Sequence, residues 1–397
     1  MCAEREVLMN DSIDAALIYE MERLDSLIER EALVRLAAEL YDPLTGGFYY
    51  SLSARDNDEF YPDIESTAQM LVTLSSLGLF KYSDAHTERF PDWFREGLTG
   101  FFHARQDEKT GFFFDTQFGK AVSESKKGRN TGQSLGRLSE LGVKPLYPTP
   151  DERVAKNENS ESVLAEHYKS LESYRAWLDS LDWQSDDGHK QYYGANMISA
   201  SYGSIVAAGY LDYTREYLRG VQNSETGLWG KRLDSMAINA AMKLSGIFDD
   251  RCKYPNVDKM IASILKVVEA EEPYSVATLW NPLVLVRNIL GKYGEMPDAL
   301  KEDIDRVKLP LIRLSVDRLA RFKKPDGGCS YYPDKSSATS QGVTVGLGLC
   351  ESDVNATMIG TASMRDTVYR ITRLGDHKPL LSELNTLFFD EIGRKRK

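Results

Sequence analysis

The chain has 397 residues, 42% of them hydrophobic, so it can bury a large core. Its net charge of −11 argues against nucleic acid or an anionic membrane as the main partner, because phosphate groups are bound by clustered Lys and Arg. No stretch approaches the ~18 consecutive apolar residues of a membrane helix, and the acidic N-terminus does not resemble a secretory signal, so a cytoplasmic location is expected.

Two kinds of helical stretch alternate along the chain. Six are amphipathic and charged on one face: Ser12–Leu40, Thr87–Gln106, Ser160–Leu181, Tyr210–Gln222, Asn256–Glu271 and Asp298–Lys323. Six others are shorter and apolar nearly all round: Ile64–Leu79, Thr131–Leu141, Ala195–Ala208, Met236–Gly246, Ser275–Leu290 and Val354–Leu374. A helix that is apolar on every side is buried. The alternation predicts an all-α, single-domain (α/α)6 toroid over residues 1–397, with six inner and six outer helices. A two-domain chain would need a linker between its domains. The best candidate is the polar segment 144–160, but it fits equally well as a long connection between an inner and an outer helix of one domain.

A glycine–aromatic turn follows five of the six outer stretches. These turns are DPLTGGFYY (42–50), DEKTGFFFD (107–115), SDDGHKQYY (185–193), NSETGLWG (223–230) and KPDGGCSYY (324–332). We expect each glycine to adopt a positive φ as the C′ residue that ends a helix. The repeat resembles that of terpenoid-cyclase and protein-prenyltransferase toroids, and also turns in toroid polysaccharide lyases and glycoside hydrolases. This resemblance implies an architecture and no single reaction.

The starts of the predicted inner helices each carry a polar side chain. In a toroid one ring of helix ends surrounds the mouth of the central cavity, so these side chains are expected to converge on one opening: Asp63, Asn130, Asn196, Asn239, Asn281, Asp353 and Asn355. Helix capping explains the same residue types, and Asp63 and Asp353 are placed where either role is expected. Asn239 and Asn355 stand within apolar runs, where asparagine is a poor helix and core residue, so they are the better candidates for substrate binding.

Several chemistries fit such a ring. DIESTA (63–68) resembles the DxDDTA acid motif of class II terpene cyclases, but Glu65 and Ser66 replace two aspartates. The zinc ligands of prenyltransferases have no match, nor do the glycine-rich phosphate loops, so neither a metal nor a cofactor is expected. Sugar chemistry would use aromatic platforms such as Trp229 and Trp280, and hydrolysis would need two opposed carboxylates.

A polysaccharide lyase needs a base and a group that neutralises the uronate carboxylate. One stretch, 186–202, supplies His189, Tyr192, Tyr193, Asn196 and Tyr202. The sequence therefore predicts a carbohydrate-active lyase or hydrolase that acts on acidic oligosaccharides. Its predicted catalytic residues are His189, Tyr193, Glu65 and Asp353, with the two carboxylates expected to have pKa values lowered by the helix dipole. The predicted substrate-binding residues are Asp63, Tyr192, Asn196, Tyr202, Trp229, Asn239, Trp280 and Asn355. The alternatives are a terpene-cyclase-like isomerase and a non-catalytic toroid that binds a glycan or a protein.

Overall fold

The chain folds almost entirely into helices in the computed structural model, which describes residues 2–84, 90–156, 165–248, 253–292, 296–374 and 378–396. Within these ranges the regular strands are β1 (Thr339–Ser340) and β2 (Val343–Thr344), which pair antiparallel with Ser340 opposite Val343. The all-α prediction is confirmed.

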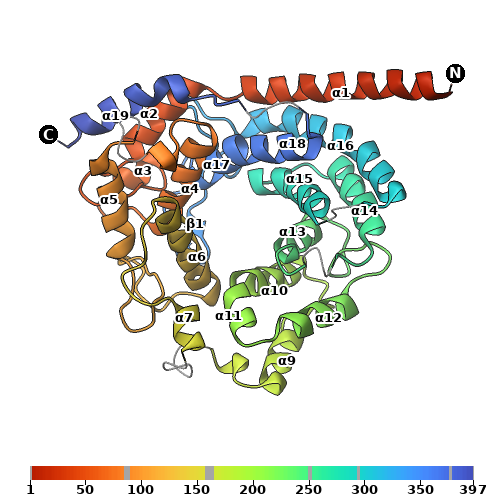
Figure 1. Cartoon of the computed structure of the whole chain (residues 1–397), viewed down its shortest axis with the longest axis horizontal. Coiled ribbons are helices and arrows are strands. Elements are labelled where there is room, and N and C mark those ends of the chain that lie inside the picture. The colour runs from red at the N-terminus through yellow and green to blue at the C-terminus, as the bar shows by residue number, and fades with distance from the viewer. Residues whose placement is uncertain are drawn as a thin grey trace.

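Each stretch predicted to be an inner helix is helical. These inner helices are α4 (Ile64–Ser76), α6 (Glu124–Glu140), α10 (Gly188–Ala200) with α11 (Tyr202–Ala207), α13 (Ser235–Leu244), α15 (Val276–Gly291), and α17 (Val354–Met358) with α18 (Met364–Thr372). The last two are joined by a π-helical turn, η4 (Ile359–Ser363). Along the chain α4 contacts α6, α6 contacts α10, α10 contacts α13, α13 contacts α15 and α15 contacts α18. Because α17 contacts α4, the series of neighbours closes on itself, as Figure 1 shows.

A second set of helices lies outside this series in Figure 1. They are α1 (Cys2–Ser26), α2 (Arg30–Leu40), α5 (Asp92–His103), α9 (Leu171–Ser180), α12 (Leu211–Val221), α14 (Val257–Ala270), α16 (Asp298–Leu319) and α19 (Asn385–Arg394). The prediction of a single helix over Ser12–Leu40 is wrong, because the helix is interrupted between α1 and α2. The first part, α1, contacts α16, and the second part, α2, contacts α19. The helix predicted for Ser160–Leu181 falls partly outside the described residues and regular α-helix begins only at Leu171, after a Ser170 capping box.

Short helices occupy the connections. They are α3 (Leu52–Arg55), η1 (Tyr82–Asp84), α7 (Pro150–Ala155), η2 (Glu166–Tyr168), η3 (Ala320–Phe322) and η5 (Ser382–Leu384). The hydrophobic core lies between inner and outer helices, where Ile238 of α13 and Ile261 of α14 belong to one cluster and Leu71 of α4 and Phe94 of α5 to another. The inner helices therefore bury one side in the core and can carry polar groups on the other.

Four of the glycine turns share one backbone structure. Each closes with an isolated antiparallel bridge between the end of a helix and the aromatic segment: Tyr41 with Phe48, Gln106 with Phe113, Gln222 with Trp229 and Lys323 with Cys329. The turn glycines Gly46, Gly111, Gly227 and Gly327 all have positive φ, from 69° to 87°. The predicted φ is confirmed, but these glycines lie in hairpin turns beyond the helix end and are not C′ residues. Gly188 of the remaining turn instead begins α10.

The turn glycines also pack against an outer helix or the connection before it. A β-carbon on Gly227 would lie 2.5 Å from the Met260 nitrogen and the Asn256 oxygen at the start of α14, and one on Gly327 would lie 2.6 Å from Ala32 and Leu33 of α2. Only glycine allows both the positive φ and this close approach.

Gly227→Ala is therefore expected to destabilise the protein more than Gly209→Ala. Gly209 has a similar φ of 76°, but a β-carbon there meets nothing within 4 Å, so it should cost only the ~1–2 kcal/mol of left-handed backbone strain. Gly227→Ala should cost a further ~1–3 kcal/mol, as overpacking does. Urea unfolding of the two variants measures the difference, and equal losses would show that α14 moves to make room.

Candidate functional site

Asp63 and Asp353 cap inner helices. The Asp63 carboxylate accepts a hydrogen bond from the Ser66 nitrogen (2.9 Å), and Asp353 accepts from the Ala356 nitrogen (2.8 Å). Asp353 also accepts from the backbone nitrogens of Tyr331 and Ser337, so it ties the segment after α16 to the start of α17. Burial raises the pKa of Asp353 to about 6 despite these donors, so the predicted lowering is wrong.

Asp115, which sequence reasoning missed, joins α4 and α6 to the segment that follows α5. It accepts from the Ile64 nitrogen (2.8 Å) and from Asn130 Nδ2 (3.0 Å), and it pairs with Arg105 (3.4 Å). Burial, together with the neighbouring Asp63, raises the pKa of Asp115 to about 6. These contacts hold the starts of α4 and α6 in place beside the cluster of charged side chains around Glu65.

Glu65 is the centre of a buried ion cluster. Its two oxygens lie 2.5 Å from Arg129 Nε and 3.2 Å from Lys126 Nζ, and Ser340 of β1 donates a further hydrogen bond at 2.8 Å. The side chains of Lys126 and Glu65 are 0% and 4% exposed. Burial opposes ionisation, but Arg129 and Lys126 outweigh it and lower the pKa of Glu65 to about 2. Glu65 is thus a fixed carboxylate, as predicted, although two cations rather than the helix dipole account for it.

The β1–β2 hairpin reaches this cluster through its tip. Gln341, with a left-handed φ of 50°, accepts hydrogen bonds through Oε1 from Ser125 Oγ (2.9 Å) and Asn196 Nδ2 (3.2 Å). Asn196 also donates to Ser125 Oγ at 2.7 Å. The hairpin therefore links the starts of α4 and α6 to the middle of α10.

A cavity of about 380 Å³ opens beside these groups, between α6, α10 and α11, and extends to Lys243 on α13. Its polar lining includes Arg129, Asn196, Tyr202 and Asp151. Burial lowers the pKa of Lys243 to about 8, and the positive charge of Arg129 lowers it further than the carboxylate of Glu65 raises it. Lys243 was missed from the sequence, although a lysine inside the apolar run SMAINAAMKL is itself a signal.

The predicted site residues of the stretch 186–202 divide between two faces of α10, except Tyr202, which begins α11. Asn196 and Tyr202 line the cavity just described. Burial raises the pKa of Tyr192, the charge of Arg129 lowers it and the charge of Glu65 raises it, so Tyr192 lies near both groups. His189 and Tyr193 instead lie in a separate pocket of about 500 Å³ with Trp177 of α9. Residues four apart share a helix face, so 189 and 193 go together and 192 and 196 go together. The prediction that all of them form one site is wrong.

The remaining predicted residues are already engaged. Asn239 accepts a hydrogen bond from Asn281 (2.7 Å), and Asn355 accepts one from Gln69 (3.0 Å), whose amide also donates to Glu65. Trp229 is fully buried and donates to the Leu218 carbonyl (2.9 Å), so it offers no ring face to a sugar. Trp280 packs against the core and donates to Thr367 (3.0 Å). Trp229 therefore holds the fold together, contrary to its predicted role as a platform, whereas Trp280 is only partly buried and its predicted role stays a prediction.

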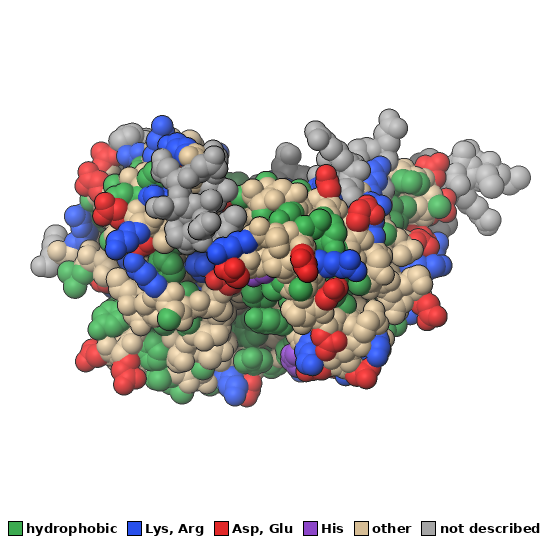
Figure 2. Space-filling view, turned by 90° about the horizontal axis from the view of Figure 1, so that it is seen from below, with side chains coloured by type: hydrophobic (Ala, Val, Ile, Leu, Met, Phe, Trp, Pro, Cys, Tyr) green, Lys and Arg blue, Asp and Glu red, His purple; other side chains and the backbone are tan. Residues whose placement is uncertain are grey.

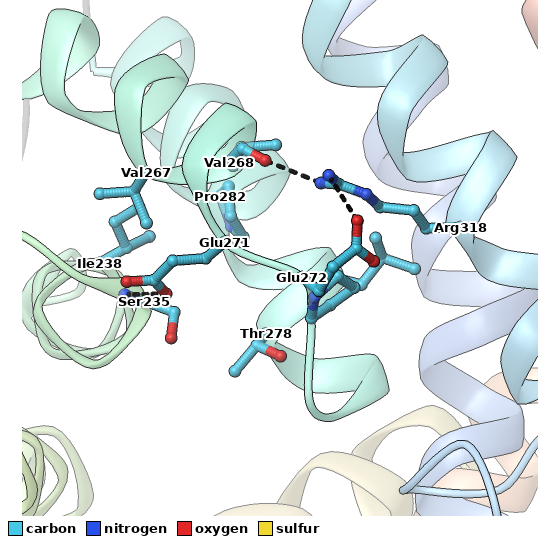
Figure 3. A pocket seen from close by; sticks show the side chains of 11 residues that line it. Ser235, Ile238, Val267, Val268, Glu271, Glu272, Thr278, Pro282 and Arg318 are labelled. Carbon is cyan, nitrogen blue, oxygen red and sulfur yellow. Dashed lines mark hydrogen bonds and ion pairs between the residues drawn. The ribbon is translucent and has the colours of Figure 1, made fainter.

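A third, much smaller pocket lies at the starts of α13 and α15. Figure 3 shows Glu271 directed toward Ser235, whose backbone nitrogen donates to it at 3.0 Å, and Arg318 between Val268 and Glu272. Arg318 donates to the Val268 carbonyl (2.7 Å) and pairs with Glu272 (3.1 Å). The space left is about 20 Å³, room for about one water molecule, so these residues join helices and do not bind a substrate.

Acidic and basic side chains are interspersed on the face shown in Figure 2. Among the described residues, no helix combines the length and hydrophobicity that crossing a lipid bilayer requires. Compared with known proteins, the chain matches no protein-family model and no curated protein sequence.

Proposed function

We propose that the protein is a single-domain (α/α)6 toroid over residues 1–397 and a carbohydrate-active enzyme that cleaves acidic oligosaccharides in the cavity between α6, α10 and α13. The architectural part is supported by the alternation of inner and outer helices and by the contact of α17 with α4. The repeated glycine turns, each seated against an outer helix or the segment before it, support it further.

The observation that carries the proposed substrate class is the charge of the cavity. Arg129 and Lys243 line it together with one carboxylate, that of Asp151, and Lys126 pairs with Glu65 in the same cluster as Arg129. The chain as a whole carries a net charge of −11, so this local excess of cations runs against the overall charge. Because a cation in a partly desolvated site binds anions strongly, a uronate carboxylate is the group we expect here.

Elimination fits this cavity better than hydrolysis. A glycosidase needs two carboxylates on opposite sides of the scissile bond. Of the described residues that line the cavity, only Asp151 carries one, while Glu65 is held by Arg129 and Lys126. A terpene-cyclase-like reaction is disfavoured by the same cluster, because it needs a protonated acid where Glu65, with its pKa of about 2, is ionised.

The proposed reaction uses the lysine amine as a base. Neutral Lys243 removes the proton from the carbon next to the uronate carboxylate, and Arg129 neutralises that carboxylate so that the proton is more acidic. The electron pair forms a carbon–carbon double bond while the bond to the leaving sugar oxygen breaks. That oxygen takes a proton from the hydroxyl of Tyr202, which lines the same cavity. The proton on Lys243 then returns through solvent to Tyr202.

Incubation with a panel of uronate polymers tests the proposal. We expect an increase in ultraviolet absorbance from the conjugated double bond of the product, and none with neutral polymers of similar length. New reducing ends without absorbance would indicate hydrolysis. Binding without cleavage would indicate a non-catalytic glycan-binding protein. Neither binding nor cleavage of any acidic glycan would overturn the proposed substrate class.

A further inference from the structure

Lys243, which is partly buried, differs from Lys126, Lys324 and Lys395 in having no partner among the described residues. Lys126 is paired with Glu65, Lys324 donates to the Pro333 carbonyl and Lys395 donates to two carbonyls of α2. Among the described residues, none accepts a hydrogen bond from the Lys243 ammonium or pairs with it, and the side chain borders a cavity. An unpaired amine on a partly buried side chain that borders a cavity is available to a ligand.

The surroundings of Lys243 favour its neutral, nucleophilic form. Burial lowers the pKa of the amine to about 8, and Arg129 of α6 adds a like charge. The other charged or titratable groups that face it are Glu65 of α4, Asp151 of α7 and Tyr202 of α11. Enzymes activate lysine nucleophiles by this combination of desolvation and a neighbouring cation.

We infer that Lys243 is a covalent attachment site, which forms an imine with a small aldehyde or ketone that carries an anionic group. The amine lone pair attacks the carbonyl carbon and a carbon–nitrogen bond forms. The carbon–oxygen bond then breaks, and the oxygen leaves as water with the two protons that the amine nitrogen gives up. The reaction needs no oxidant or reductant. Arg129, in the same cavity lining, is the group that would position the anion. This inference uses the same amine as the proposed elimination but does not depend on any glycan being cleaved.

Pyridoxal 5′-phosphate, an aldehyde with a phosphate group, is the probe for this site. The full chain is incubated with the probe, the imine is reduced with sodium borohydride, and the modified lysine is identified by peptide mass mapping. We expect one adduct per chain on Lys243, formed on the order of tenfold faster at pH 7 than on exposed lysines, because more of its amine is neutral. The extent of labelling should rise with pH to a midpoint near 8.

Two variants complete the experiment. Lys243→Arg should remove the adduct, whereas Lys231→Arg, a change at an exposed lysine paired with Asp186, should leave it unchanged. Arg129→Gln should slow labelling and move the midpoint to higher pH. Adducts spread over exposed lysines, with Lys243 unmodified in the wild-type map, would overturn the inference, and that result does not depend on whether either variant folds.

Discussion

Lys243→Met is expected to lower the rate of uronate elimination by about 10²–10⁴-fold, the usual effect of removing a general base. Methionine keeps much of the volume of the side chain but cannot accept a proton. In the wild-type protein the rate should rise as Lys243 loses its proton, with a half-maximum near pH 8, because the neutral amine is the active form.

The matched controls lie on the other face of α10. Lys190→Met changes a lysine in the separate pocket with His189 and Tyr193, so its rate should equal that of the wild type. His189→Ala and Tyr193→Phe should also leave the rate unchanged, in contrast to their role predicted from sequence. A slow Tyr193→Phe variant beside an active Lys243→Met variant would move the active site to that pocket.

Glu65→Gln should lower the free energy of unfolding by about 3–5 kcal/mol, because it leaves the fully buried Lys126 without its carboxylate. Glu39→Gln is the matched control. Glu39 also contacts two cations, Arg55 and Lys395, but its side chain is 54% exposed, so the loss should stay below about 1 kcal/mol. Urea unfolding at neutral pH compares them, and similar losses in both variants would show that the buried cluster adds no special stability.

Glu65→Gln should also change how the stability of the folded protein depends on pH. The pKa of Glu65 is about 2 in the folded protein, below its ordinary value of 4.5, so its stabilising effect is present above pH 4.5 and is lost as the pH falls toward 2. The Gln variant lacks this contribution. The difference in stability between wild type and variant should therefore shrink between pH 4.5 and pH 2, and a constant difference would contradict the assigned pKa.

The inner helices could be predicted because the segments that pack against the core are apolar along much of their length. The expectation that they are buried on every side is wrong, since α6 and α10 bury one face and carry polar groups on the other. The break between α1 and α2 could not be predicted, since neither glycine nor proline stands near residues 27–29 and the separation comes from packing of the two halves against α16 and α19. The π-helical turn at Ile359–Ser363 likewise has no local signature in an apolar run.

The candidate site was predictable only where a residue stood out in its local sequence. Glu65 was singled out by its place in DIESTA at the start of a predicted inner helix, and Lys243 could have been found as Asn239 and Asn355 were, because it interrupts an apolar run. The partners of Glu65 and Asn196 could not be read from the sequence, since Lys126 and Gln341 are 61 and 145 residues away from them. The prediction that His189 and Asn196 share one site was wrong, because it relied on their closeness in sequence. On a helix, the period of 3.6 residues per turn determines which side chains share a face.

The contact between α17 and α4 bears on how the protein is made. The Val354 nitrogen donates to the Tyr50 carbonyl, and the buried face of α4 is completed by a helix that begins 290 residues (354 − 64) after it. At about 5–20 residues per second, a ribosome needs about 15–60 s to deliver that partner. During this time the nascent chain presents an uncovered apolar surface, so we expect chaperones that shield hydrophobic segments to improve the yield of folded protein. A chain that stops before Val354 should aggregate rather than fold.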